Sequence, residues 1–152
     1  MLPIESFDTF AREAEPRLRQ ALSASLGSER GRDATADALA YGWEHWSRVA
    51  GMDNPFGYLF VVGRERGRRP DRRPPPVELL AVEQGRTPWI EPGLPDALSQ
   101  LSEQQRLVVM LLHCFQWTMS EVAELMDVKK STVQSYAERG MDGLRNRMGV
   151  AT

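Results

Sequence analysis

Apolar residues recur every three or four positions over residues 6–26, which is the spacing of an amphipathic helix. Pro16 falls inside this stretch and predicts a kink or a helix start near it. The polar segment that follows, LGSERGRD, is predicted to be a loop. The helical spacing returns over residues 34–49, and a third helix is predicted to begin near Phe56 and to run into a cluster of arginines. The first half of the chain therefore predicts a three-helix unit.

After this unit the pattern stops and then resumes at Asp96. Residues 70–95 are rich in proline and charge, which favours extended, semi-rigid backbone outside any packed core, so they are predicted to be a linker. No stretch of useful length alternates between apolar and polar residues as a strand would. The chain is therefore predicted to be all-α, with two small helical domains (residues 1–69 and 96–152) joined by a Pro/Arg-rich linker.

The most informative stretch, residues 118–145, predicts two short helices separated by a tight turn. Thr118 and Glu121 have the spacing of a capping box, in which each side chain satisfies a free backbone N–H at a helix start. After the turn, an apolar stripe with helical spacing comprises Val133, Ala137, Met141 and Leu144. Such a unit lays its second helix in the major groove of DNA, so the C-terminal domain is predicted to be a helix-turn-helix.

Polar and basic residues fill the positions between the stripe residues and are candidates for DNA contact. They are Lys129, Lys130, Ser131, Thr132, Gln134, Ser135 and Arg139. A lysine at a helix start interacts unfavourably with the helix dipole and destabilises the helix by roughly a few tenths of a kcal/mol, unless a phosphate is nearby. This cost favours a DNA-binding face over a merely solvated one. We expect the two lysines to grip phosphates, and Ser131, Gln134 and Ser135 to face base edges. Ser131 has cap chemistry and could instead start the helix two residues late.

The formal net charge of the chain is −2, so affinity for nucleic acid has to come from local basic patches. An arginine cluster at the end of the third predicted helix is one such patch, and it is either a DNA contact or a solvated linker start. Arg64 and Arg68 are its candidate DNA-binding residues. Tyr58 lies off the apolar face of this helix and is the better candidate there for stacking on a base, whereas its other aromatic residues are predicted to be core.

Candidates for metal or thiol chemistry are few. His45, His113 and a buried-looking Cys114 provide too few ligands with no recognisable spacing, so no metal and no cofactor are expected. No phosphate loop, nucleophile motif or carboxylate pair is present, so the chain is not expected to be an enzyme. The N-terminus lacks the pattern of a signal peptide and no apolar run approaches a membrane span, so a cytoplasmic location without membrane contact is expected.

These features resemble the extracytoplasmic-function (ECF) group of bacterial RNA polymerase sigma factors. The matching C-terminal positions are Leu98, Leu101, Gln104-Gln105-Arg106, Glu121-Val122-Ala123, Thr132-Val133, Ser135, Arg139 and Leu144-Arg145. In that group this domain binds the promoter −35 element. In the N-terminal half, Trp46, Tyr58-Leu59-Phe60 and Val62-Gly63-Arg64 resemble the helices that bind the polymerase clamp and the −10 element.

The resemblance implies a sigma factor that directs core RNA polymerase to promoter DNA, with an anti-sigma factor as a further partner. It assigns polymerase binding to Asp37, Leu39, Trp43 and Trp46. Three departures accompany it: an alanine-rich segment, 36–40, replaces the family's polar run, Glu65 stands where Asn is common, and Lys129 replaces the usual Ser.

Two alternatives stay open from the sequence. One is a sigma-like, helix-turn-helix regulator that binds DNA, as a dimer, without engaging core polymerase, which the alanine-rich segment favours. The other is a module that binds an anti-sigma or other protein partner through its tryptophans, Trp43, Trp46 and Trp89.

Overall fold

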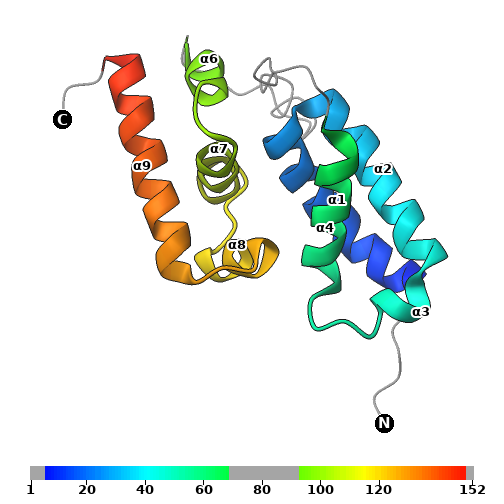
Figure 1. The fold of residues 1–152 in the computed structure, drawn as a ribbon. Coiled ribbons are helices and arrows are strands. Elements are labelled where there is room, and N and C mark those ends of the chain that lie inside the picture. Colours follow the sequence, from blue (N-terminus) through cyan, green and yellow to red (C-terminus); the bar gives the residue numbers. More distant parts are fainter. Residues whose placement is uncertain (1–5, 69–92, 150–152) are drawn as a thin grey trace.

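The computed structural model describes residues 6–68 and 93–149, and every regular element within these two ranges is a helix (Figure 1). The predicted fold class, all-α with a helix-turn-helix at the C-terminal end, is confirmed. The described residues form an N-terminal and a C-terminal group of helices, on either side of residues 69–92. Those residues hold most of the predicted linker and lie outside the description.

The first helix, α1 (Phe7–Leu26), is a single element of 20 residues. Ser6 caps it, because its side chain accepts a hydrogen bond from the backbone N–H of Thr9. The helix continues through Pro16, whose ring is exposed, so the predicted alternative of a helix start at this proline is wrong.

The connection from α1 to α2 (Ser28–Glu44) contradicts the sequence prediction, because LGSERGRD is not a loop. A single residue, Gly27, makes the reversal with a φ of 94°, a region that glycine enters at little cost. Four residues later Gly31 packs directly on α1, where a Cβ would collide with the backbone of Ser23. Glycines that read as loop markers in the sequence therefore serve a tight turn and a close helix crossing.

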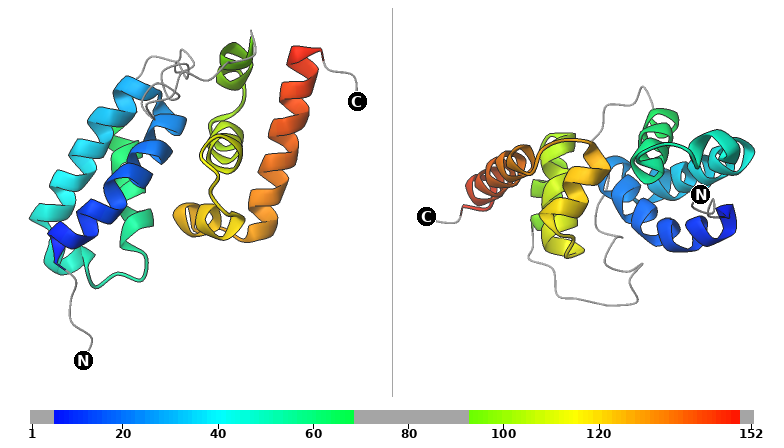
Figure 2. Two further views of the ribbon diagram at one scale, coloured as in Figure 1. Left: turned by 180° about the vertical axis from the view of Figure 1, so that it is seen from behind. Right: turned by 90° about the horizontal axis from the view of Figure 1, so that it is seen from below.

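The helix predicted over residues 34–49 is interrupted at His45, so α2 is followed by the short α3 (Trp46–Val49). The third predicted helix is confirmed as α4 (Pro55–Gly67). Asn54 caps α4 by accepting a hydrogen bond from the N–H of Gly57 at 3.0 Å. Helices α1, α2 and α4 pack against one another (Figure 2).

The C-terminal group is a succession of short helices that ends in one long helix. Its elements are α6 (Leu94–Ser99), α7 (Glu103–Val109), the π-helical turn η1 (Met110–Cys114), α8 (Met119–Met126) and α9 (Lys130–Met148). Because α6 begins at Leu94, the last two residues of the predicted linker are helical. Ser102 caps α7, since its hydroxyl accepts from the N–H of Gln105.

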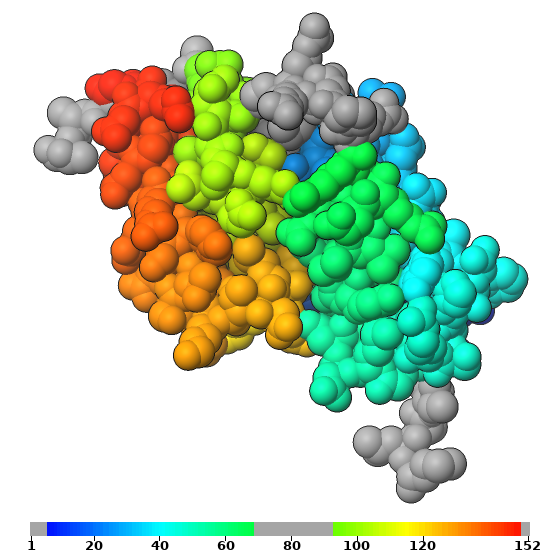
Figure 3. Space-filling model, viewed as in Figure 1, coloured from blue at the N-terminus to red at the C-terminus, as the bar shows by residue number. Residues whose placement is uncertain are grey.

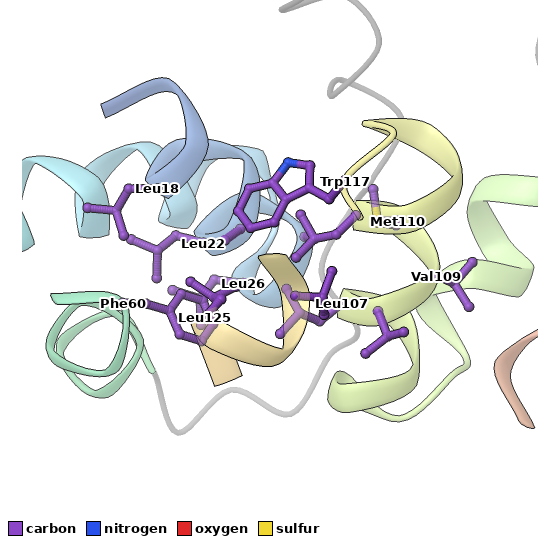
Figure 4. Packing of buried hydrophobic residues seen from close by; sticks show 14 of the residues in the cluster. Leu18, Leu22, Leu26, Phe60, Leu107, Val109, Met110, Trp117 and Leu125 are labelled. Carbon is purple, nitrogen blue, oxygen red and sulfur yellow. The ribbon is translucent and has the colours of Figure 1, made fainter. Parts of the chain in front are cut away.

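The two groups of helices share one apolar core. Figure 4 shows α1 and α4 contributing side chains from one side and the C-terminal group from the other. The labelled residues that meet there are Leu18, Leu22, Leu26, Phe60, Leu107, Met110, Trp117 and Leu125. In the space-filling view, α4 lies directly against the C-terminal group (Figure 3). The N- and C-terminal domains are thus packed together in this conformation, which we call the closed form.

A buried arginine joins the two domains by hydrogen bonds in the closed form. Arg106 is 4% exposed, yet it belongs to α7 and donates to the last turn of α1. Its Nε donates to the carbonyl of Ala24 and its Nη2 to that of Ser25, both at 2.9 Å. Because the last four carbonyls of a helix lack partners within it, the guanidinium supplies hydrogen bonds and opposite charge where both are needed. Desolvation lowers the pKa of Arg106, opposed by the nearby Glu103 carboxylate.

A second set of polar contacts joins α1 to the start of α8. The indole N–H of Trp117 donates to the side chain of Gln20 at 2.8 Å. Arg17 lies over the Trp117 ring, 4.4 Å from its centroid, and pairs with Glu121 at 2.8 Å. Together these contacts satisfy the polar groups at the rim of the apolar interface.

Candidate nucleic-acid interface

Helix α8 begins with the predicted capping box. The hydroxyl of Thr118 accepts from the N–H of Glu121 at 3.1 Å, and the Glu121 carboxylate accepts from the N–H of Thr118 at 2.8 Å. These bonds to the charged carboxylate, aided by the Arg17 ion pair, lower the pKa of Glu121. The helix ends at Asp127, which adopts a left-handed conformation with a φ of 55°. The sequence thus fixes both ends of the first helix of the helix-turn-helix.

Helix α9 buries the predicted stripe and exposes the residues between. Val133, Ala137 and Leu144 are buried and Met141 is half-buried. Of the seven candidate DNA-binding residues, six are exposed and Thr132 is half-buried. The exposed six are Lys129, Lys130, Ser131, Gln134, Ser135 and Arg139. The structure therefore places the seven candidates of the C-terminal domain on α9 and its cap position, six of them within its first two turns or at the cap and Arg139 near the middle of the helix.

The start of α9 differs from one of the two sequence predictions. The helix begins at Lys130 with Lys129 at the cap position, so the late start at Ser131 is wrong. No side chain caps this helix and its first turn holds no acidic residue. Its free N–H groups and two lysines give this end a positive potential suited to a phosphate. One turn further on, Gln134 donates to the carboxylate of Glu138 at 3.1 Å.

The candidate DNA-binding residues of the N-terminal domain lie on or at the end of α4 and, unlike the candidates on α9, contact residues of other helices. Tyr58 is half-buried, and its hydroxyl is 3.1 Å from that of Tyr41 on α2. Arg64 and Arg68 both face Glu103 of α7, with nearest distances of 4.0 and 3.2 Å. In the closed form, these two arginines are therefore engaged by the C-terminal domain. Of the other arginines in the cluster, Arg66 lies on α4, and residues 69, 72 and 73 lie outside the described residues.

Sequence reasoning missed an aromatic and basic cluster around Tyr41. The ring of His45 stacks on that of Tyr41 at 4.4 Å, Arg48 donates to its hydroxyl, and Arg66 lies 5.1 Å from its ring centroid. The pKa of Tyr41 is lowered by its hydrogen bond with Tyr58 and by Arg48, against desolvation, whereas the bond to Tyr41 raises the pKa of Tyr58. The spacing of Tyr41, His45 and Arg48 along consecutive turns was the signal available in the sequence.

The four residues assigned to polymerase binding fall into two environments. Asp37 and Trp43 are exposed on α2, with Trp43 68% exposed, and Leu39 is half-buried against the core. Trp46 packs at the start of α3 against two aromatic residues of α1, Phe7 at 5.6 Å and Phe10 at 5.0 Å. The outward-facing pair is thus available to a partner, whereas Trp46 mainly holds α3 on α1.

A cleft of about 450 Å³ lies where the two domains meet. It is lined by α4 and the loop before it, and by the end of α8 with its turn. Its lining includes Met52, Asn54, Val61, Arg64 and Leu125. The side-chain N–H of Asn54 also donates to the carbonyl of Glu124 at 2.6 Å across this boundary. The cleft therefore exists only while the two domains are in contact.

The described residues were compared with the ligand sets that hold metal ions in proteins. Within them, no group of three or more His, Cys, Asp or Glu side chains is placed to hold a metal ion. Cys114 is exposed at the end of η1, so its expected burial is wrong. None of the described helices is both long enough and apolar enough to cross a bilayer.

Comparison with known proteins finds one matching family model and a solved structure with a similar fold. Residues 93–142 match the family model described as sigma-70, region 4, so the C-terminal helix-turn-helix belongs to that family. A solved structure with a similar fold is that of the sigma factor RpoE in complex with the anti-sigma factor NepR from Bartonella quintana. It aligns with a TM-score of 0.58 and 20% sequence identity over 96% of this chain and 98% of that chain. No curated protein matches the sequence significantly.

The two comparisons cover different parts of the chain. The C-terminal third carries the sigma-70 region 4 sequence, and the whole chain has the fold of a two-domain sigma factor. The family match thus covers the helix-turn-helix of the C-terminal domain, and the likeness to the sigma factor RpoE extends to the fold of both domains.

Proposed function

We propose that this protein directs core RNA polymerase to promoters, with α9 reading a −35-type element in the major groove. The observation that carries the proposal is the exposure of six polar candidates at the start and along the first half of α9, a helix whose opposite face is buried. Lys129 and Lys130 would neutralise phosphates, while Gln134 and Ser135 would meet base edges. The site holds no catalytic group, so its role is positional and the chemistry belongs to the polymerase.

In this proposal the N-terminal domain binds polymerase through the exposed Asp37 and Trp43, with Leu39 and Trp46 supporting them, and engages the −10 region through Tyr58, Arg64 and Arg68. Each DNA contact alone is weak for a chain with a net charge of −2. Polymerase would hold both domains near one promoter and so raise the effective concentration of each for its element. The RpoE structure contains an anti-sigma factor, which supports an anti-sigma protein as a further partner.

The DNA-reading role is tested by Gln134→Ala and Lys130→Ala in promoter binding and run-off transcription with core polymerase. A good bidentate glutamine–adenine contact discriminates by about 1–3 kcal/mol, so Gln134→Ala should lose affinity mainly for promoters with the preferred base. Lys130→Ala should weaken binding to all sequences and reduce the salt dependence by about one counterion. Asn146→Ala, an exposed change near the other end of α9, is the matched control. Unchanged promoter use by both variants would exclude this role for α9.

Polymerase engagement is tested by co-elution of the purified chain with core polymerase, with Trp43→Ala as the variant and Glu13→Gln as a distant control. A sigma factor should co-elute and give specific transcripts, and the loss of the exposed indole should weaken co-elution. The alternative of a regulator that does not engage polymerase draws on one observation: Ala36 and Ala40 are exposed on α2 and offer no polar contact. DNA binding without co-elution would establish that regulator.

A further inference from the structure

We infer that Glu103 of the C-terminal domain masks a phosphate-binding site formed by Arg64 and Arg68 of the N-terminal domain, so that the closed form inhibits its own DNA binding. This inference rests on the proposed function, because it names how the DNA contacts of α4 are regulated. It concerns an intramolecular competition between one carboxylate and a nucleic-acid phosphate for the same two guanidiniums.

The first observation is the geometry around the Glu103 carboxylate. Arg68 donates through Nη2 to both of its oxygens, at 3.2 and 3.4 Å. The Nε of Arg64 lies 4.0 Å from Oε1, and the hydroxyl of Ser25 donates to that same oxygen at 2.5 Å. Three donors from the N-terminal domain thus surround one acidic side chain from the other domain. A carboxylate held in this way resembles an anionic ligand in its site.

The second observation is that the site is incompletely satisfied. The Nε of Arg64 is buried and has no hydrogen-bond partner within the described structure, since 4.0 Å from Glu103 is too long for one. A buried donor without a partner carries a desolvation cost. A phosphate group has more acceptor oxygens than a carboxylate, and bidentate arginine–phosphate pairs are strong. The pair of arginines would therefore gain hydrogen bonds on exchanging Glu103 for a phosphate.

The third observation is that Glu103 is held in place by its own helix. Glu103 and Arg106 are three residues apart on α7, so they face the same side of that helix. Arg106 anchors this side to the end of α1, which keeps the carboxylate over Arg64 and Arg68. A DNA strand that takes these arginines therefore has to displace Glu103, and the approach of a phosphate backbone to α4 favours separation of α7 from it.

The test compares Glu103→Gln with wild type for binding of a fluorescent 20-base DNA strand at low salt, measured by anisotropy. Glutamine keeps the size and the acceptor for Ser25 but removes the charge, so DNA should bind about three- to tenfold tighter, the range expected for the loss of one or two exposed ion pairs. Glu13→Gln removes the same charge at an exposed position of α1 with no contact to the site and should leave affinity within about twofold of wild type. Small-angle scattering should show an unchanged radius of gyration, because the shared apolar core and Arg106 still hold the two domains together in Glu103→Gln.

A charge exchange provides the second arm. Arg68→Glu places two carboxylates together and should lower the midpoint of urea denaturation, whereas Arg68→Glu with Glu103→Arg should restore the midpoint without restoring DNA affinity. Equal DNA affinity for Glu103→Gln and Glu13→Gln would overturn the inference. If that result came with intact co-elution and transcription, the proposed function would stand without the mask. Loss of co-elution and of all DNA binding would remove both.

Discussion

Replacing Arg106 with methionine should remove the strongest polar tie between the two domains. Methionine has a similar length and fills the volume, but it leaves the carbonyls of Ala24 and Ser25 without donors inside the interface. A buried polar group left unsatisfied costs about 1–3 kcal/mol, which gives about 2–6 kcal/mol for the two. Removing the desolvated guanidinium returns part of this cost. The expected net loss in the free energy of unfolding is therefore about 2–4 kcal/mol.

Urea denaturation followed by tryptophan fluorescence measures this loss, because Trp117 lies in the interface beside Arg17. Arg106→Met should lower the midpoint and, since the change lies between the domains, broaden the transition or divide it in two. The control is Arg12→Met, an exposed arginine of α1, which should change stability by less than about 0.5 kcal/mol. An Arg106→Met protein within about 1 kcal/mol of wild type, with a single sharp transition, would refute the view that this guanidinium holds the closed form.

Three further predictions concern local structure. Gly31→Ala should destabilise the protein by about 2 kcal/mol or more in thermal denaturation, because its Cβ meets the backbone of Ser23 at the α1–α2 crossing; the exposed Gly51→Ala is its control. Thr118→Ala should cost about 1 kcal/mol through loss of the cap, and Thr118→Ser should recover most of it in the same measurement. Because the pKa of Glu121 is lowered in the folded protein, its contribution to stability is fully present above the unfolded pKa of about 4.5 and is lost as the pH falls through the folded pKa. Glu121→Gln should therefore flatten the decline of stability in acid. An unchanged acid profile would count against this role.

Local signals in the sequence predicted the helices and the helix-turn-helix because caps and apolar stripes act within a few residues. Thr118 with Glu121, and the stripe from Val133 to Leu144, needed no tertiary information. The same reasoning failed at Gly27 and Gly31, where glycines serve a one-residue turn and a helix crossing rather than a loop. Local composition does not distinguish these uses, since the difference lies in what the glycine packs against.

The candidate site divides in the same way. The residues of α9 could be predicted because a helix with one buried face necessarily presents the other to solvent. The state of Arg64 and Arg68 could not, since their partner Glu103 is 35 residues away along the chain from Arg68 and across a segment rich in proline. An arginine cluster read from the sequence appears free for DNA, and only the tertiary structure shows that an acidic residue already occupies part of it.

This contrast gives the two DNA-binding regions different access in the closed form. The start of α9 is exposed and needs no rearrangement, whereas Arg64 and Arg68 face Glu103, which under the inferred mask has to leave them before a phosphate binds. The apparent affinity of a site equals its intrinsic affinity multiplied by the fraction of molecules that are competent to bind. The apparent DNA affinity of α4 is therefore lowered by the mask, whereas that of α9 is not. If the inferred mask operates, α9 should engage a promoter first, and contact by α4 should follow as a slower, more salt-dependent step that Glu103→Gln accelerates. Binding in a single step with the same rate in both proteins would show that Arg64 and Arg68 are equally accessible in the closed form.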